Sequence, residues 1–244
     1  MRKYVLCSLL WLSLVTTAPQ AVASLTPHTA VYKVKISIAS GSLTTTVAED
    51  NDGFQVQSVI QPKGFAGLFF RGVIEENSRF SLSDDGVIPQ HYWSKDELSS
   101  EPKTMDFVFD WGEQQVNGTI NDEAFAFDLA GQVHDRVSIQ YQLMHNLTTG
   151  QAGSGYALLD GDELKQIDVR NIGRKSIRVP YGRFDAVGIQ HQAEGSKRIT
   201  TLWCAEELGY LPVLIEQSRK GEVKVRAVLR DYQSAATAAD ASPH

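Results

Sequence analysis

The chain has 244 residues and a formal net charge of −6, so it is long enough to bury a sizeable core and acidic overall. Lys and Arg form no run anywhere in the sequence. An acidic chain without a basic run argues against nucleic acid and against anionic membrane surfaces as partners.

The first 23 residues have the pattern of an export signal. Arg2 and Lys3 precede an apolar core, Tyr4–Val15, and Ala21–Ala23 offers the small-x-small sequence that a signal peptidase recognises. We therefore expect cleavage after Ala23, a periplasmic mature chain with a charge of about −8, and no transmembrane segment after cleavage. Cleavage also removes one of the two cysteines, so we expect no internal disulfide.

After the signal, apolar and polar residues alternate with the period of two that is typical of half-buried β-strands. The first three strands are expected to form an antiparallel meander that turns at Ser40-Gly41 and at Asp50–Gly53. Short strands continue the pattern to Arg230. The strands expected after the meander are Val73–Leu82, Gly86–Lys95, Thr104–Trp111, Val116–Ile120, Ala124–Leu129, Gly155–Leu159, Glu163–Arg170, Lys175–Val179, Phe184–His191 and Glu222–Arg230.

Metal, cofactor and catalytic motifs are not predicted. The acidic turn Asp50–Gly53 does not fit an EF-hand, because Ala48 and Val59 occupy positions that need acidic ligands. The six histidines show no metal-ligand spacing, and no phosphate loop or nucleophile elbow occurs. We expect a protein that is not an enzyme and that needs no cofactor.

The segment Pro62–Phe70 interrupts the alternation with a dense apolar patch flanked by glycines. One interpretation is a plug at one end of the β core, and the other is a lid or an apolar portal, since exposed apolar patches usually bind something. The candidate ligand contacts in it are Phe65, Leu68, Phe69 and Phe70.

A helix is predicted over Gln132–Leu147, where apolar residues recur at spacings of three and four and Asp135 can cap the start. We expect it to cover an open end or edge of the sheet. His134, Asp135 and Ser138 suggest a hydrolytic triad, but adjacent residues on a helix face different ways, so this reading is not favoured.

The segment Ile199–Glu216 reads as a hairpin, with a strand ending at Trp203, a polar corner, and a second strand that enters through Pro212. Trp203 and Tyr210 are two further candidate ligand contacts. The sequence divides into a signal (1–23), a β domain (24–232) and a polar tail (233–244) that is expected to be disordered.

A series of short segments recurs in a particular order and spacing: Tyr32–Val34, Lys63–Leu68, Ile88–Tyr92, Met105–Trp111, Asp135–Ser138 with Tyr141–Leu143, Val179–Val187 and Trp203–Val213. In these segments the chain resembles the exported bacterial proteins grouped as the domain of unknown function DUF3108. The resemblance covers nearly all of the mature chain, and it implies a periplasmic β-rich domain with no settled activity to transfer.

Taken together, these patterns predict one antiparallel β domain of about a dozen strands, curled or closed into a barrel, with one helix against it. That shape is similar to the lipid- and lipoprotein-carrier folds of the bacterial envelope. The function expected is a monomeric, non-catalytic module that binds an apolar or lipid-like envelope component. The alternatives are a structural protein that docks an envelope protein through its surface and an enzyme whose site the linear sequence does not reveal.

Overall fold

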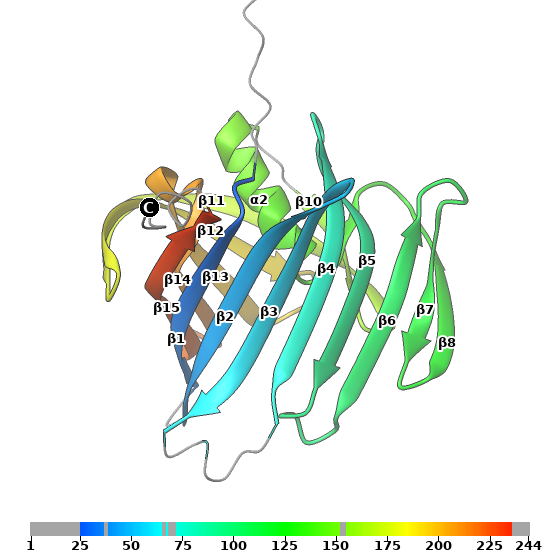
Figure 1. The fold of residues 1–244 in the computed structure, drawn as a ribbon, viewed down its shortest axis with the longest axis horizontal. Helices are drawn as coiled ribbons and strands as arrows, with labels where there is room; N and C mark the ends of the chain where they lie inside the picture. The colour runs from blue at the N-terminus through cyan, green and yellow to red at the C-terminus, as the bar shows by residue number, and fades with distance from the viewer. Residues whose placement is uncertain (1–24, 37–38, 65–66, 68–71, 152–154, 236–244) are drawn as a thin grey trace, which may run out of the picture.

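The computed structural model describes residues 25–36, 39–64, 67, 72–151 and 155–235, and these form one 15-stranded sheet with a helix packed against it (Figure 1). The strand order is β8-β7-β6-β5-β4-β3-β2-β1-β15-β14-β13-β12-β11-β10-β9. The predicted fold class is confirmed: the sheet is mainly antiparallel and strongly curled. It does not close into a barrel, because β8 and β9 are its two edges and do not pair with each other.

Two meanders make up the sheet and meet where the first strand pairs with the last. The first meander forms the front wall in Figure 1 and the second forms the wall behind it. The front strands are β1 (His28–Ile36), β2 (Ala39–Asp50), β3 (Gly53–Lys63), β4 (Ile74–Ser83), β5 (Gly86–Asp96), β6 (Lys103–Asp110), β7 (Gln115–Ile120) and β8 (Glu123–Asp128). The rear strands are β9 (Val133–His134), β10 (Gly155–Asp160), β11 (Glu163–Val179), β12 (Gly182–Ala193), β13 (Arg198–Ala205), β14 (Leu211–Arg219) and β15 (Glu222–Ser234).

The alternation seen in the sequence places one side of each strand in the core. In β6, Met105, Phe107 and Phe109 are buried, while the residues between them are exposed. The rings of Phe107 and Phe109 belong to one aromatic cluster, in which the ring centroid of Tyr92 on β5 lies 5.0 Å from that of Phe107. This burial of alternate apolar side chains is the main stabilising contribution to the curled sheet.

Most predicted strand ends shift by a residue or two, and two strands, β11 and β15, differ by more. The segments expected as separate strands, Glu163–Arg170 and Lys175–Val179, form the single strand β11, because an irregularity in pairing between Asn171 and Arg174 lets the ladder with β12 continue. The last strand extends to Ser234, where it pairs with His28 of β1.

The predicted hairpin around Pro212 is present, with β13 and β14 joined by a short 3-10 helix, η1 (Glu206–Leu208). Pro212 sits opposite Cys204 at an irregularity in the ladder, where a missing N–H is tolerated. The carbonyl of Pro212 accepts a hydrogen bond of 2.9 Å from the buried hydroxyl of Tyr32. This bond links β14 to β1 across the intervening strand β15.

The helix α2 (Ser138–Thr149) begins later than predicted, because residues Val133 and His134 pair with β10 as strand β9. Its covering role is confirmed, and it is buried on two sides. Tyr141 and Met144 pack into the larger core cluster, whereas Ile139 and Leu143 pack into a smaller cluster on β10, β12 and β13. No helix among the described residues is long and apolar enough to cross a bilayer.

Asp135 fixes the start of α2 with three hydrogen bonds. Its Oδ1 accepts the backbone N–H groups of Val137 and Ser138, each at 2.8 Å. Its Oδ2 accepts the hydroxyl of Ser78 on β4 at 2.9 Å. One buried carboxyl thereby caps the helix and attaches it to the front wall, although burial raises its pKa.

Arg136 adds a charged connection between the two walls. Its Nε lies 3.3 Å from Glu76 of β4 and 4.0 Å from Asp160 of β10. Lys165 of β11 is 2.8 Å from the same Asp160. Tyr92 donates a hydrogen bond of 2.7 Å to Glu76. These contacts connect the front wall to the rear wall, which strand pairing does not join at the open edges β8 and β9.

Gln142 of α2 ties the helix to the β4–β5 turn. Its Oε1 accepts the N–H of Val87 at 2.7 Å, and its Nε2 donates to Asn146 at 2.8 Å. Gly86 is required there, because its φ is +125° and an added Cβ would lie 2.3 Å from Gln142 Oε1.

The Asp135 cap yields a matched pair of variants. Asp135→Ala leaves two backbone N–H groups and the Ser78 hydroxyl without their partner, and should cost about 3 kcal/mol or more of unfolding free energy. Asp135→Asn keeps an oxygen for the N–H groups and an amide that can donate to Ser78, so it should cost less than about 1 kcal/mol. Urea unfolding measures both. Equal losses would contradict the assigned hydrogen bonds.

Titration of His134 should make the stability of the protein depend on pH. Both ring nitrogens lack a partner among the described residues, and burial lowers the pKa of the imidazole to about 4. The unfolded chain binds a proton below its usual pKa of 6.5, whereas the native protein does so only near 4. Stability should therefore fall as pH drops from about 6.5 to about 4, by up to about 3 kcal/mol.

The control for this prediction is His134→Phe, which keeps a ring against Tyr156 and cannot titrate. Its stability should depend less on pH over the same range. Asp135 is present in both proteins, so its contribution cancels in the difference between the curves. Parallel curves would show that His134 does not cause the acid sensitivity.

Candidate ligand-binding site

A cavity of about 320 Å³ lies at the upper end of the sheet in Figure 1, where α2, η1, the start of β1 and the end of β15 meet. Its walls are mainly apolar. The apolar lining comes from Leu25, Leu82, Met144 and Leu208, and the buried polar lining from His28, Tyr141 and His145.

The spacing of residues on α2 explains how one helix contributes so much of this wall. Tyr141, Met144, His145 and Thr148 line the cavity, and they recur at intervals of three and four. Such intervals place side chains on one face of a helix. The Tyr141 ring also packs against Phe80 of β4, with ring centroids 5.3 Å apart.

His28, a residue of the cavity wall, has a hydrogen-bond acceptor without a partner among the described residues. Its Nδ1 lies 2.7 Å from the carbonyl oxygen of Thr26, so in the neutral ring this nitrogen carries the proton and donates it. Burial lowers the pKa of His28, which keeps the ring neutral near pH 7. Its Nε2 is buried, makes no hydrogen bond with any described residue, and is left as an acceptor.

Tyr141 and His145 leave two more polar atoms without partners. The Tyr141 hydroxyl and His145 Nε2 are buried, and neither has a hydrogen-bond partner in the described part of the chain. Burial raises the pKa of Tyr141, so its hydroxyl stays protonated and can donate. Buried polar atoms in proteins are nearly always paired, so three unpaired atoms on residues that line one cavity call for an explanation, and a bound polar group would supply it.

Charge is sparse at this cavity. Glu207 of η1 contributes to the wall, and no Lys or Arg of the described residues lines it. A carboxylate ligand would therefore meet like charge at Glu207. A neutral group that both donates and accepts, such as a hydroxyl or an amide, matches His28 and Tyr141 better.

The triad suggested by the sequence does not form. Ser138 Oγ accepts the backbone N–H of Asp135 at 3.0 Å, and Asp135 is occupied by the cap and by Ser78. The ring nitrogens of His134 make no hydrogen bond in the described residues. These three residues hold the helix start in place, and no nucleophile–base pair exists among them.

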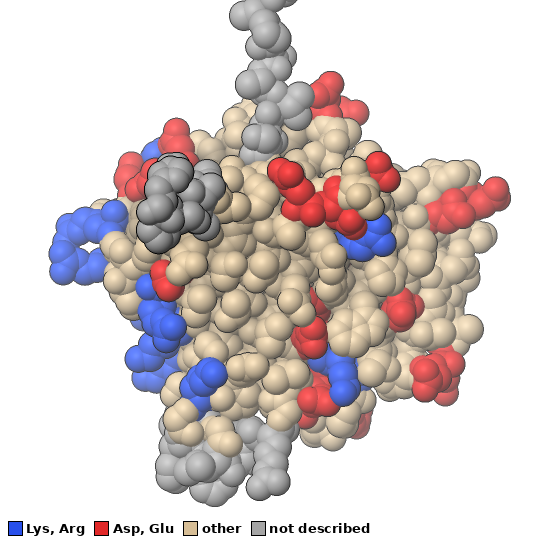
Figure 2. All heavy atoms as spheres, in the orientation of Figure 1, with Lys and Arg blue, Asp and Glu red and all other residues tan. Residues whose placement is uncertain are grey.

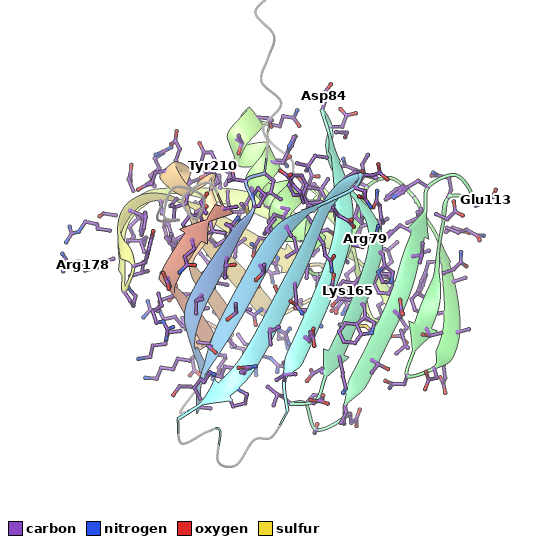
Figure 3. The ribbon with its side chains drawn as sticks, viewed as in Figure 1. Arg79, Asp84, Glu113, Lys165, Arg178 and Tyr210 are labelled. Atoms are coloured by element: carbon purple, nitrogen blue, oxygen red, sulfur yellow. The ribbon has the colours of Figure 1, made fainter. Side chains whose placement is uncertain are left out.

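The ligand contacts predicted from the sequence do not coincide with this cavity. Phe65, Leu68, Phe69 and Phe70 lie outside the described residues. Trp203 is half-buried on β13, where Lys175 Nζ lies 5.8 Å from the ring centroid. Tyr210 follows η1 at the upper end of the sheet (Figure 3) with a φ of +61°. Neither lines the cavity, and a ligand role for any of the six stays a prediction.

Sequence reasoning missed His28 and His145 as site residues, because each looked like an isolated histidine. The helical spacing of Tyr141 and Met144 was visible, but it indicated only a buried face. What brings these residues together is the pairing of β1 with β15 beside α2, which joins opposite ends of the chain.

Comparison with known proteins agrees with this fold. A crystal structure titled as a beta-barrel-like protein of the domain of unknown function DUF1849 from Brucella abortus aligns with a TM-score of 0.57 and 11% identity. The alignment covers 86% of this chain and 98% of that one, so it shows a shared fold. No curated protein matches the sequence significantly. Residues 29–228 match the family described as protein of unknown function (DUF3108), and the chain belongs to that family.

Proposed function

We propose that this protein is an exported, non-catalytic binding protein of the periplasm that holds a small amphipathic molecule. The observation that carries the proposal is the apolar cavity with three unpaired polar atoms, on His28, Tyr141 and His145. Sites for small molecules are usually apolar pockets with a few polar groups that fix orientation.

The size of the cavity limits the ligand. At about 320 Å³ it is at the small end of the usual range for ligand pockets, about 300–1,000 Å³. It suits one short apolar chain or ring with a single polar group. A lipid with several long acyl chains would exceed it.

Binding without chemistry is the simplest role for these side chains. Catalytic nucleophiles are activated by a base within hydrogen-bond distance, and that base is oriented by a third group. His28 is instead bonded to a backbone carbonyl, and Tyr141 has no basic partner in the described residues. Export is supported by the n-region, apolar core and Ala-x-Ala site of the first 23 residues.

Two ligands with the same chain length, one neutral and one a carboxylate, test which polar group the cavity prefers. We expect 1-octanol to bind, measured by its displacement of a fluorescent apolar probe, and octanoate to bind at least about tenfold more weakly at pH 7.5 because of Glu207 and desolvation. Tyr141→Phe should weaken octanol about fivefold to tenfold by removing one hydrogen bond. The unfolding free energy should be unchanged or higher, since an unpaired buried hydroxyl is lost.

A second pair of variants tests the place of binding. Leu208→Trp fills the cavity and should abolish probe binding, whereas Leu164→Trp, at a partly exposed site on β11, should leave it intact. If neither the probe nor octanol binds the wild type, the cavity proposal is wrong. Docking of an envelope protein through the surface would then be the better proposal.

Export is tested separately by mass. Expressed with its own first 23 residues in a Gram-negative host, the protein should be recovered from the periplasm with an intact mass that starts at Ser24. A mass that retains Met1, or a mature start elsewhere, would contradict the assigned cleavage site.

A further inference from the structure

Charge is segregated on this acidic protein. Figure 2 shows Lys and Arg gathered in two groups on the left, while Asp and Glu dominate the right half. The upper group lies over the hairpin of β11 and β12, where Figure 3 labels Arg178, and the lower group lies over the lower ends of β1, β14 and β15. The basic residues of this lower surface, called here the basic edge, lie at the lower ends of β1, β14 and β15. They are Lys33, Lys35, Arg219, Lys220, Lys224 and Arg226.

The ladder places like charges directly beside each other on the basic edge. Lys35 is the register partner of Arg226, and on its other side Lys35 faces Ser40, whose next partner is Lys63. Like charges directly opposite in neighbouring strands are destabilising. The stability of the sheet therefore does not explain why these cations lie side by side.

Few of these cations are neutralised. Arg226 pairs with Glu216 at 2.9 Å, and Lys224 pairs with Glu222. Lys33, Lys35, Arg219 and Lys220 have no ion pair in the described residues. The basic edge therefore keeps a net positive charge on a chain that is acidic overall.

The turn between β14 and β15 carries a lysine that its geometry does not favour. Lys220 and Gly221 have φ values of +54° and +80°, the left-handed conformations of a two-residue hairpin turn. Asn-Gly is the preferred pair for such a turn, and a lysine at φ > 0 is strained. Lys220 thus places a positive charge at the tip of the hairpin, although it makes the turn less stable than Asn would.

Exposed aliphatic side chains lie at the same end. Ile36, at the end of β1, is 47% exposed, and Val223, at the start of β15, is 53% exposed. Because successive residues of a strand point to opposite faces, Ile36 and Val223 lie at the rim on the inner face, whereas Lys35 and Lys224 point outward. Nucleic-acid sites instead combine basic residues with exposed aromatic rings or base-reading polar groups.

The geometry points to the basic edge as a docking surface for a bilayer of anionic phospholipids. The cations would lie among the lipid headgroups. Attraction to an anionic leaflet is worth about 1 kcal/mol for each Lys or Arg near the surface, which is about fivefold in affinity.

This inference goes beyond ligand binding and does not depend on it. His28 of the cavity and Ile36 of the basic edge lie at opposite ends of β1, a nine-residue strand, and so are roughly 25 Å apart. Docking through the lower end would leave the cavity at the upper end open.

The test is co-sedimentation with vesicles. We expect binding to vesicles of phosphatidylglycerol and phosphatidylethanolamine, no binding to phosphatidylcholine vesicles, and a loss of at least about tenfold at 0.5 M salt, where charges are screened. The double variant Lys33→Gln with Lys35→Gln should bind about twentyfold more weakly. All variants are compared with the wild type in the same form, so residues 1–23 contribute equally.

Two further variants separate binding from folding. Lys220→Asn removes a charge and suits the turn, so vesicle binding should fall about fivefold while the urea midpoint holds or rises. Lys95→Gln removes an exposed lysine from β5, outside the basic edge, and should change vesicle binding less than about twofold.

The inference is overturned if anionic vesicles are not bound, or if phosphatidylcholine vesicles are bound equally well. It is also overturned if Lys95→Gln weakens binding as much as Lys220→Asn does. Equal salt-sensitive binding to duplex DNA would assign the basic edge to polyanions in general. None of these results bears on octanol binding, which is measured without vesicles.

Discussion

The structure depends on one constraint, a sheet that does not close: the apolar core packs its two walls together, and hydrogen bonds and ion pairs join them where strand pairing ends. Strand pairing ends at β8 and β9, so backbone hydrogen bonds cannot hold the front and rear walls together there. Asp135 and Arg136 supply the missing connections, through Ser78 and Glu76 on one wall and Asp160 on the other. The same carboxyl starts the helix that fills the space between the walls. A buried charge is costly, and here several donors offset that cost.

The helix between the walls has two features with opposite effects on the stability of the protein. Its residues from Ser138 to Asn146 are almost all buried, and they tie the two hydrophobic clusters together. Yet its upper turns leave Tyr141 and His145 with unpaired polar atoms beside a cavity. An apolar residue at either position would relieve this penalty in the free protein. Retaining polar side chains there is reasonable if a ligand pairs with them, since functional sites commonly give up stability.

The segments that resemble the DUF3108 family have structural explanations. Tyr32 bonds to Pro212 across one strand, and Asp135 and Arg136 hold the walls. Tyr141 is different, because it belongs to a matching segment and also lines the cavity. The other matching residues named here thus stabilise the fold. This explains why a family without a settled activity can be recognised from its sequence. The shared fold with a DUF1849 protein at 11% identity fits the same view.

The sequence by itself determined the fold class, because the period of two and the turn residues are local properties of the chain. It also indicated the helix and the hairpin around Pro212, which depend on neighbours within a few residues. Only the tertiary structure decided the rest. The cavity joins His28 to Tyr141, and the basic edge joins Lys35 to Arg226, and each pair is separated by more than a hundred residues. The sequence showed no basic run, because these cations come from strands at opposite ends of the chain. They become neighbours only when β15 pairs with β1, and no local signal records that pairing.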